Sequence, residues 1–160
     1  MGAVDGPLVW PVGTPNSFAG WPEEDHGVMS TVTQIPFVDY LVLEPVPHLV
    51  AHECAGCGAR FFDRRNACAG CFGVEFHPVD VATEGTVRSF TIVTFAAPGV
   101  EVPFVAAVVD CDGTSVRGNI VNCPPDPEHV RLGMAVTLTT ISMGSDDHGV
   151  EAFNYGFEPA

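Results

Sequence analysis

The sequence of 160 residues contains no lysine, so its positive charge is confined to six arginines. Against these stand 20 aspartates and glutamates, and the formal net charge at pH 7 is −14. Nucleic acids and anionic membranes are bound non-specifically through lysine and arginine, because these side chains displace counterions from phosphates or face anionic lipid. The charge balance therefore argues against binding to either surface.

The sequence also lacks the long apolar runs that membrane insertion and secretion require. No segment approaches the roughly 18 unbroken apolar residues of a membrane span. Residues 1–15 have neither a basic start nor a continuous apolar stretch, so we expect no secretory signal there. Without such a signal, we expect a cytoplasmic protein whose cysteines are reduced rather than joined in disulfides.

Recognisable catalytic motifs are absent as well. We find no Ser-His-Asp arrangement, no carboxylate-pair signature, no Walker loop and no dinucleotide fingerprint. Cys111 and Cys123 each lack a second cysteine nearby and belong to no nucleophile motif, so buried free thiols explain them better than catalysis does. The chain alone is therefore not expected to be an enzyme.

Apolar residues, in contrast, are abundant. They make up 46% of the sequence, which is a globular composition. A protein of this size has a large surface relative to its volume, so some of these side chains should remain exposed. A partner subunit would cover them, and a well-filled barrel interior is the alternative.

The first 50 residues are predicted to hold two modules. Residues 1–36 are rich in Pro, Gly, Ser and Thr, and we expect an extended N-terminal arm, with a disordered leader as the alternative. Residues 37–50 are expected to form a short helix and a linker. Phe37, Tyr40 and Leu41 recur at helical spacing between two prolines, although the abundance of Val and Leu also permits a strand.

Two Cys-x-x-Cys pairs dominate residues 51–78. Cys54 and Cys57 form the first pair, and Cys68 and Cys71 follow after ten residues. Each pair can place two thiolates on one tight turn, and the intervening loop lets four sulfurs surround one metal ion. We therefore predict a zinc ribbon with a structural Zn2+, because four thiolates leave no position for water or substrate. Two disulfides, four unrelated thiols and a rubredoxin-like iron site are the alternatives.

Half of the arginines lie in the loop of this predicted ribbon. Arg60, Arg64 and Arg65 form a local positive cluster in an acidic protein. Such a cluster can bind an acidic partner surface or the phosphates of a coenzyme A thioester. Ion pairs with Asp63 or Glu53 explain it equally well.

Residues 79–160 contain five short runs with the composition and alternation of β-strands. The predicted strands span residues 86–95, 104–109, 115–121, 134–142 and 150–157. The sequence Asp112-Gly113 predicts a hairpin between the second and third of them, and Asp126 can cap a single helical turn before the fourth. The fold class is therefore mainly β, with a five-stranded barrel of the OB type, and a β-sandwich is the main alternative.

Several segments occur in a familiar order. They are Pro-Phe-Val-Asp-Tyr-Leu at 36–41, the two cysteine pairs, Gly-Thr-Val-Arg-Ser-Phe-Thr at 85–91, Val-Pro-Phe-Val-Ala-Ala-Val-Val-Asp at 102–110 and Arg-Leu-Gly-Met-Ala-Val at 131–136. This order resembles the domain-of-unknown-function family thirty-five, in which a rubredoxin-like zinc ribbon precedes an acyl-CoA-associated OB-fold. The resemblance covers about residues 36–158.

The resemblance implies a non-catalytic accessory subunit. Members of this family are small partners of thiolase-superfamily enzymes, including thiolases, acyltransferases and steroid side-chain aldolases, which form or cleave a carbon–carbon bond in a CoA thioester. It implies a hetero-oligomer whose catalytic residues lie on the partner and in which a CoA thioester is bound. A stand-alone ribbon and OB module for single-stranded nucleic acid is the alternative, but the basic groove that such binding needs is missing from the sequence. A rubredoxin-like electron carrier is the third possibility.

Overall fold

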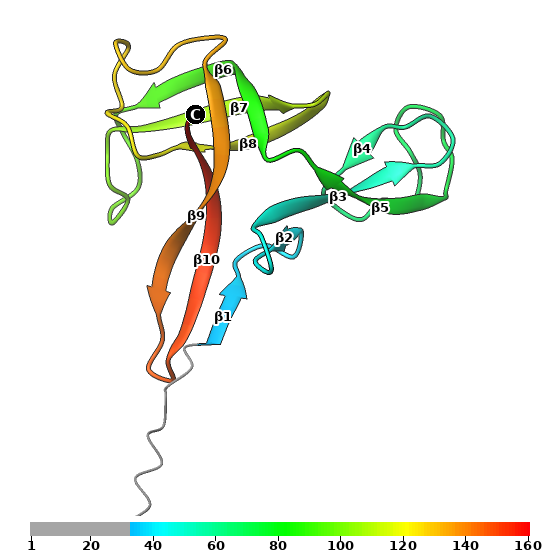
Figure 1. Ribbon diagram of the computed structural model, residues 1–160, viewed down its shortest axis with the longest axis horizontal. Helices are drawn as coiled ribbons and strands as arrows, with labels where there is room; N and C mark the ends of the chain where they lie inside the picture. Colours follow the sequence, from blue (N-terminus) through cyan, green and yellow to red (C-terminus); the bar gives the residue numbers. More distant parts are fainter. Residues whose placement is uncertain (1–32) are drawn as a thin grey trace, which may run out of the picture. The chain divides into compact units, whose positions relative to one another are not determined.

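The computed structural model describes residues 33–160, and every regular element in this part of the chain is a β-strand (Figure 1). The strands are β1 (Thr33–Pro36), β2 (Leu41–Val42), β3 (His48–Cys54), β4 (Arg60–Phe61), β5 (Phe76–Val81), β6 (Glu84–Val93), β7 (Phe104–Cys111), β8 (Thr114–Ile120), β9 (Ala135–Ser145) and β10 (Val150–Pro159). The arm predicted for residues 1–36 lies outside the described residues, apart from the four that form β1. Between residues 33 and 160, no helix has the length and apolar character needed to cross a membrane.

Strands β6 to β10 close into a five-stranded barrel. β7 pairs antiparallel with β6 and β8, and β9 pairs antiparallel with β6 and β10. The ring is completed where β10 meets β8 in parallel, at Phe157 opposite Ile120. The backbone N–H of Val121 extends this seam by donating to the carbonyl of Phe157 at 2.8 Å. This strand order is that of an OB-type barrel and confirms the predicted fold class in place of a sandwich.

The barrel wall follows from the alternation of side chains along each strand. In β7, half-buried and buried residues alternate from Phe104 to Cys111. In β6 the register shifts between Val87 and Ser89, which marks a β-bulge. The extra residue of the bulge switches the side chains that follow it to the opposite face of the strand. Val87 and Phe90 therefore both contact the core, although an odd number of positions separates them.

The helix predicted within residues 37–50 does not form. The chain turns instead, with the N–H of Leu41 donating to the carbonyl of Val38 at 3.2 Å, and then continues as β2. In β2, Leu41 lies opposite Leu49 of β3, and both leucines are 2% exposed. Burial of this pair outweighs the local helical spacing, because a turn followed by a strand can place the same apolar residues inward.

A second sheet carries the ribbon. Its central strand β3 pairs antiparallel with β2, β4 and β5. Leu49 and Ala51 of β3 and Val81 of β5 belong to the same buried cluster as the barrel residues. The base of the ribbon and the barrel therefore share one continuous hydrophobic core.

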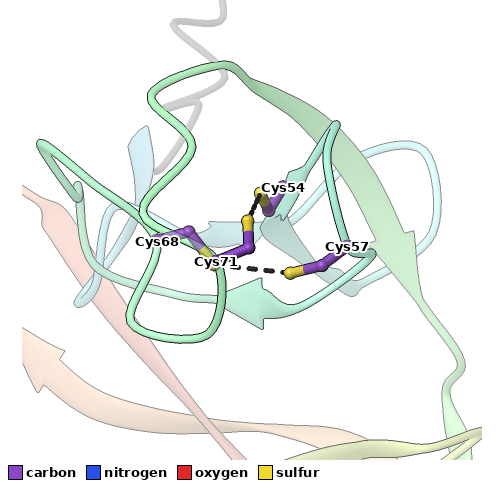
Figure 2. A group of neighbouring side chains, drawn as sticks. All are labelled: Cys54, Cys57, Cys68 and Cys71. Carbon is purple, nitrogen blue, oxygen red and sulfur yellow. Dashed lines mark hydrogen bonds between the residues drawn. The ribbon is translucent and has the colours of Figure 1, made fainter.

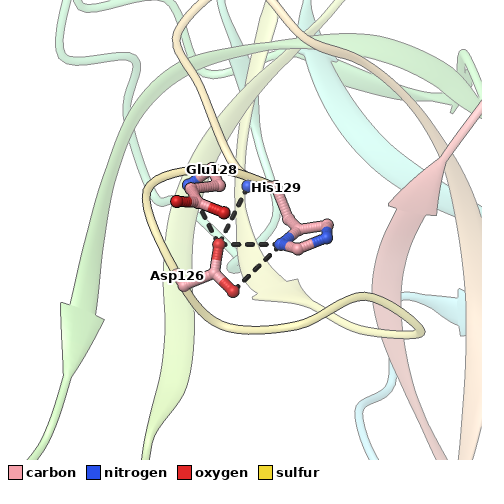
Figure 3. A network of polar contacts seen from close by, with 3 residues as sticks. All are labelled: Asp126, Glu128 and His129. Atoms are coloured by element: carbon pink, nitrogen blue, oxygen red, sulfur yellow. Dashed lines mark hydrogen bonds and ion pairs between the residues drawn. The ribbon is translucent and has the colours of Figure 1, made fainter.

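A single turn between β8 and β9 is capped by Asp126, as the sequence predicted (Figure 3). Its Oδ1 accepts hydrogen bonds from the backbone N–H groups of Glu128 at 2.9 Å and His129 at 3.0 Å. The His129 ring also lies 2.8 Å from this oxygen, and that hydrogen bond lowers the pKa of Asp126. The turn places Val130, 1% exposed, in the core and ends near Gly133, whose φ is 76°.

Candidate metal centre

The two Cys-x-x-Cys segments fold into matching turns. The first follows β3, and the second lies in the loop between β4 and β5. In the first turn, the N–H of Gly58 donates to the carbonyl of Cys54 at 2.8 Å. In the second, the N–H of Phe72 donates to the carbonyl of Cys68 at 2.9 Å. Each turn therefore presents two sulfurs on one side, as the spacing predicted.

The four thiols lie close together in one cluster (Figure 2). The Sγ atoms of Cys54 and Cys71 are 3.5 Å apart, and so are those of Cys57 and Cys68. All four sulfurs lie within 4.8 Å of one another. A tetrahedron with metal–sulfur bonds of about 2.3 Å has edges of about 3.8 Å, whereas a disulfide bond is only about 2.05 Å long. The four cysteines are free, and their spacing fits ligands that share one metal ion.

The charge balance of the cluster also fits a metal ion. The N–H of Gly70, 3.3 Å from the sulfur of Cys68, lowers the pKa of this thiol to about 6, together with the N–H of Cys71. At Cys71, the N–H of Gly73 lowers the pKa, but the sulfurs of Cys54 and Cys57 outweigh this effect and raise it to about 12. Four adjacent sulfurs cannot all be anionic unless a cation compensates them, and a divalent metal ion would do so.

Close packing around the sulfurs explains two of the nearby glycines. A Cβ atom on Gly56 or on Gly73 would lie 3.3 Å from the sulfur of Cys71, which is tighter than ordinary contact. A side chain at either position would therefore need a small shift of the Cys71 sulfur. The two glycines thus allow the backbone to lie close to the sulfur cluster.

The histidines beside the ribbon lie outside the sulfur cluster. His77 places Nε2 3.4 Å from Oε1 of Glu53, and His52 is exposed on β3. Within residues 33–160, the group of side chains placed to share a metal ion consists of the four cysteines. The structure therefore gives no support to histidine as a substitute ligand.

Arg60 is used within the chain. Its Nε donates to Oε2 of Glu53 at 2.7 Å, and its Nη1 donates to Oγ1 of Thr114 at 3.0 Å. These bonds connect the ribbon to the β7–β8 hairpin, a contact between residues 54 positions apart that no local motif could reveal. Arg65 lies over the ring of Phe61, 5.1 Å from its centroid, and Arg64 is exposed. Of the three arginines predicted to contact a partner or CoA, Arg60 is thus already hydrogen-bonded within the chain.

We expect Arg60→Met to lower stability more at pH 7 than in acid. The Arg60 guanidinium holds the pKa of Glu53 below its ordinary value of 4.5. The stabilisation from this carboxylate is therefore complete above pH 4.5 and is lost as the pH falls through the lowered value. The difference in urea midpoint between wild type and variant should shrink on acidification. Arg131→Met, at an exposed arginine, is the control, and a difference that does not change with pH would contradict the prediction.

A groove of ≈ 540 Å³ is lined by residues of β6, β7 and β8. OB barrels that bind single strands combine a basic groove with stacking aromatic residues. Here Arg117 is the one cationic lining residue, and the one aromatic lining residue, Phe90, packs against the barrel core. The groove therefore offers neither feature that the nucleic-acid alternative requires.

Comparisons with known proteins agree with the geometry. Residues 78–140 match the family described as ChsH2, C-terminal OB-fold domain. A DUF35 domain-containing scaffold protein of Methanocaldococcus jannaschii is 28% identical over 115 residues, which are 69% of this chain and 81% of that protein. A solved structure, the Ltp2-ChsH2(DUF35) aldolase, matches with a TM-score of 0.55 and 26% identity over 70% of this chain and 84% of that chain. The chain thus resembles proteins named for the DUF35 domain in both sequence and fold.

These similarities confirm the resemblance to DUF35 proteins that the order of sequence segments indicated. The family match lies over β5 to β9 and begins after the last cluster cysteine, so it concerns the barrel. The candidate metal centre is supported by the sulfur geometry itself.

Sequence reasoning missed one residue of the ribbon. Phe72 follows the second cysteine pair at the position that Gly58 takes after the first, and its φ is 61°. The signal was available in the sequence, because a tight turn of this kind normally ends in glycine.

Proposed function

We propose that this chain is a non-catalytic, zinc-binding accessory subunit of a thiolase-like complex that forms or cleaves a carbon–carbon bond in a CoA thioester. The observation that carries the proposal is the likeness to the Ltp2-ChsH2(DUF35) aldolase over 70% of this chain. A relative named as a scaffold protein supports the same role. The acyl-CoA substrate and the catalytic residues would then belong to the larger subunit.

Zinc is the metal we propose for the cysteine cluster. Four thiolate ligands suit a tetrahedral d10 ion and close its coordination shell, so the ion would stabilise the ribbon rather than activate water. Cys54 and Cys68 are each 1% exposed, which would shield the ion from solvent on that side. Reduced thiols of this kind are typical of the cytoplasm, where we propose that the protein acts.

The remaining thiols support a role without catalysis. Cys111 is 1% exposed, and burial raises its pKa to about 11. Burial raises the pKa of Cys123 as well. Neither thiol would be a useful nucleophile at neutral pH, because the reactive species is the thiolate.

Exposed apolar side chains support the presence of a partner. Phe95 and Val100, in the loop between β6 and β7, are 89% and 51% exposed. Phe72 and Val74, beside the cysteine cluster, are 83% and 71% exposed. We propose that a catalytic subunit covers part of this surface, and that Arg64 and Arg65 contact its acidic side chains or the phosphates of bound CoA.

Co-expression with a thiolase-like protein encoded beside this gene tests the proposal. We expect the two proteins to elute together in size-exclusion chromatography, with one zinc ion per copy of this chain. Acyl-CoA turnover by the catalytic protein should fall when this chain is left out. Separate elution, with full activity in the larger protein alone, would refute the proposed function.

A further inference from the structure

The two turns of the metal centre share one backbone conformation but end in different residues. The N–H of Cys54 donates to the carbonyl of Ala59 at 2.9 Å, and the N–H of Cys68 makes the equivalent bond to Gly73 at 2.8 Å. The residue just after each pair has a positive φ, 73° at Gly58 and 61° at Phe72. The first turn thus provides an internal reference for the second.

Phenylalanine is an unfavourable residue for this conformation. At positive φ the Cβ atom approaches the following carbonyl oxygen, and a bulky side chain makes such a residue an outlier. Glycine adopts the conformation without this cost, as Gly58 does in the first turn. The presence of Phe72 is therefore not explained by the fold of the turn.

Packing within the described chain does not explain Phe72 either. The other ribbon phenylalanines have aromatic neighbours: Phe61 lies 6.1 Å from Phe76, and Phe62 lies 4.9 Å from Tyr40, between ring centroids. Phe72 has no such ring contact in residues 33–160, and it is 83% exposed. Its ring is thus presented to solvent from a rigid turn.

A small groove begins at Gly73, the residue that follows Phe72. It measures ≈ 290 Å³ and is lined by Ala55, Gly56, Gly73, Val74 and Glu75. Two of its lining residues are glycines, so bare backbone forms part of the groove wall. Val74, 71% exposed, forms its apolar side. An exposed aromatic ring close to a groove is typical of protein–protein interfaces, in which side chains of one protein fill pockets of the other.

We propose that Phe72, Val74 and this groove form the surface through which the ribbon docks onto the thiolase-like catalytic subunit, with the Phe72 ring entering an apolar pocket of that subunit. The inference rests on the proposed function. The loop between β4 and the second cysteine pair carries Arg64 and Arg65 against Asp63, a net charge of 2 − 1 = +1, in a chain of net charge −14. Complementary charge orients such contacts, so the partner surface that faces Arg64 and Arg65 would be acidic, whereas the part that faces Glu75 in the groove would be neutral or basic.

The substitution Phe72→Gly separates docking from folding. It removes the ring and supplies the residue that suits a φ of 61°. We expect one zinc ion per chain and a melting temperature that is unchanged or higher, while the Kd for the co-purified catalytic subunit rises by about tenfold or more, as for an interface anchor. Phe72→Tyr keeps an aromatic ring on the same backbone and should bind within about threefold of wild type.

The outcomes distinguish the two proposals. If wild type binds the catalytic subunit and Phe72→Gly binds equally well, the docking surface is refuted and the proposed function stands. If wild type does not bind at all, the proposed function fails and the docking inference with it. Loss of self-association in Phe72→Gly, without weaker binding to the catalytic subunit, would assign the surface to a second copy of this chain and overturn the inference.

Discussion

Cys68→Ser is expected to release the metal and unfold the ribbon. Serine offers a hydroxyl in place of the thiolate, so the four-sulfur shell loses a ligand at a position that is 1% exposed. Metal binding and folding are coupled in small sites of this kind, and the loop between β4 and β5 has little other regular structure. Zinc measured by mass spectrometry of the native protein should fall from one ion per chain to near zero, and amide exchange in residues 54–75 should become fast.

Cys123→Ser is the matched control for this experiment. Its thiol is half-buried and lies outside the sulfur cluster, so the same chemical change should leave one zinc ion in place. Full metal content and unchanged melting in Cys68→Ser would contradict the metal centre. Detection of the four thiols as two disulfides in freshly isolated protein would do the same.

Phe157→Ala should cause the largest loss of barrel stability among single core substitutions. The ring is 0% exposed and lies at the parallel seam between β10 and β8. It packs directly on β8, because a Cβ added to Gly118 would lie 3.1 Å from the ring. Truncation of a buried phenylalanine costs about 3–5 kcal/mol, a large part of the roughly 5–15 kcal/mol that stabilises a typical domain. Urea unfolding monitored by far-UV circular dichroism would measure the change in the free energy of unfolding.

Phe95→Ala provides the comparison, since the Phe95 side chain is 89% exposed in the loop after β6. The free energy of unfolding should change by no more than about 0.5 kcal/mol. Equal losses in the two variants would show that Phe157 does not hold the seam together. Zinc content should remain at one ion per chain in both, because neither residue touches the sulfur cluster.

The barrel was largely predictable from the sequence because its strands obey local rules. Alternation along β7 and the Asp112-Gly113 turn fix two strands and their hairpin without reference to the rest of the chain. The predicted strand ends differ from the observed ones by a few residues, as at β9, which extends to Ser145. The cysteine spacing likewise identified the four thiols that the structure brings together.

The features that were missed depend on distant partners. Leu41 and Leu49 bury each other across β2 and β3, and this pairing overrides the helical spacing around Tyr40. The parallel pairing of β1 with β10 joins residues more than a hundred positions apart. The hydrogen bond from Arg60 to Thr114 likewise joins residues that are far apart in the sequence. Periodicity and turn motifs carry no information about such contacts.

The parallel seam between β8 and β10 has a consequence for the order of events during synthesis. The outermost cysteines of the cluster are 17 positions apart, whereas closing the barrel must wait for β10, which follows every other strand. A short loop closes at lower entropic cost than a long one. As the chain emerges from the ribosome, all four cysteines of the cluster are therefore synthesised before β10, while the barrel is still an open sheet with unpaired edges.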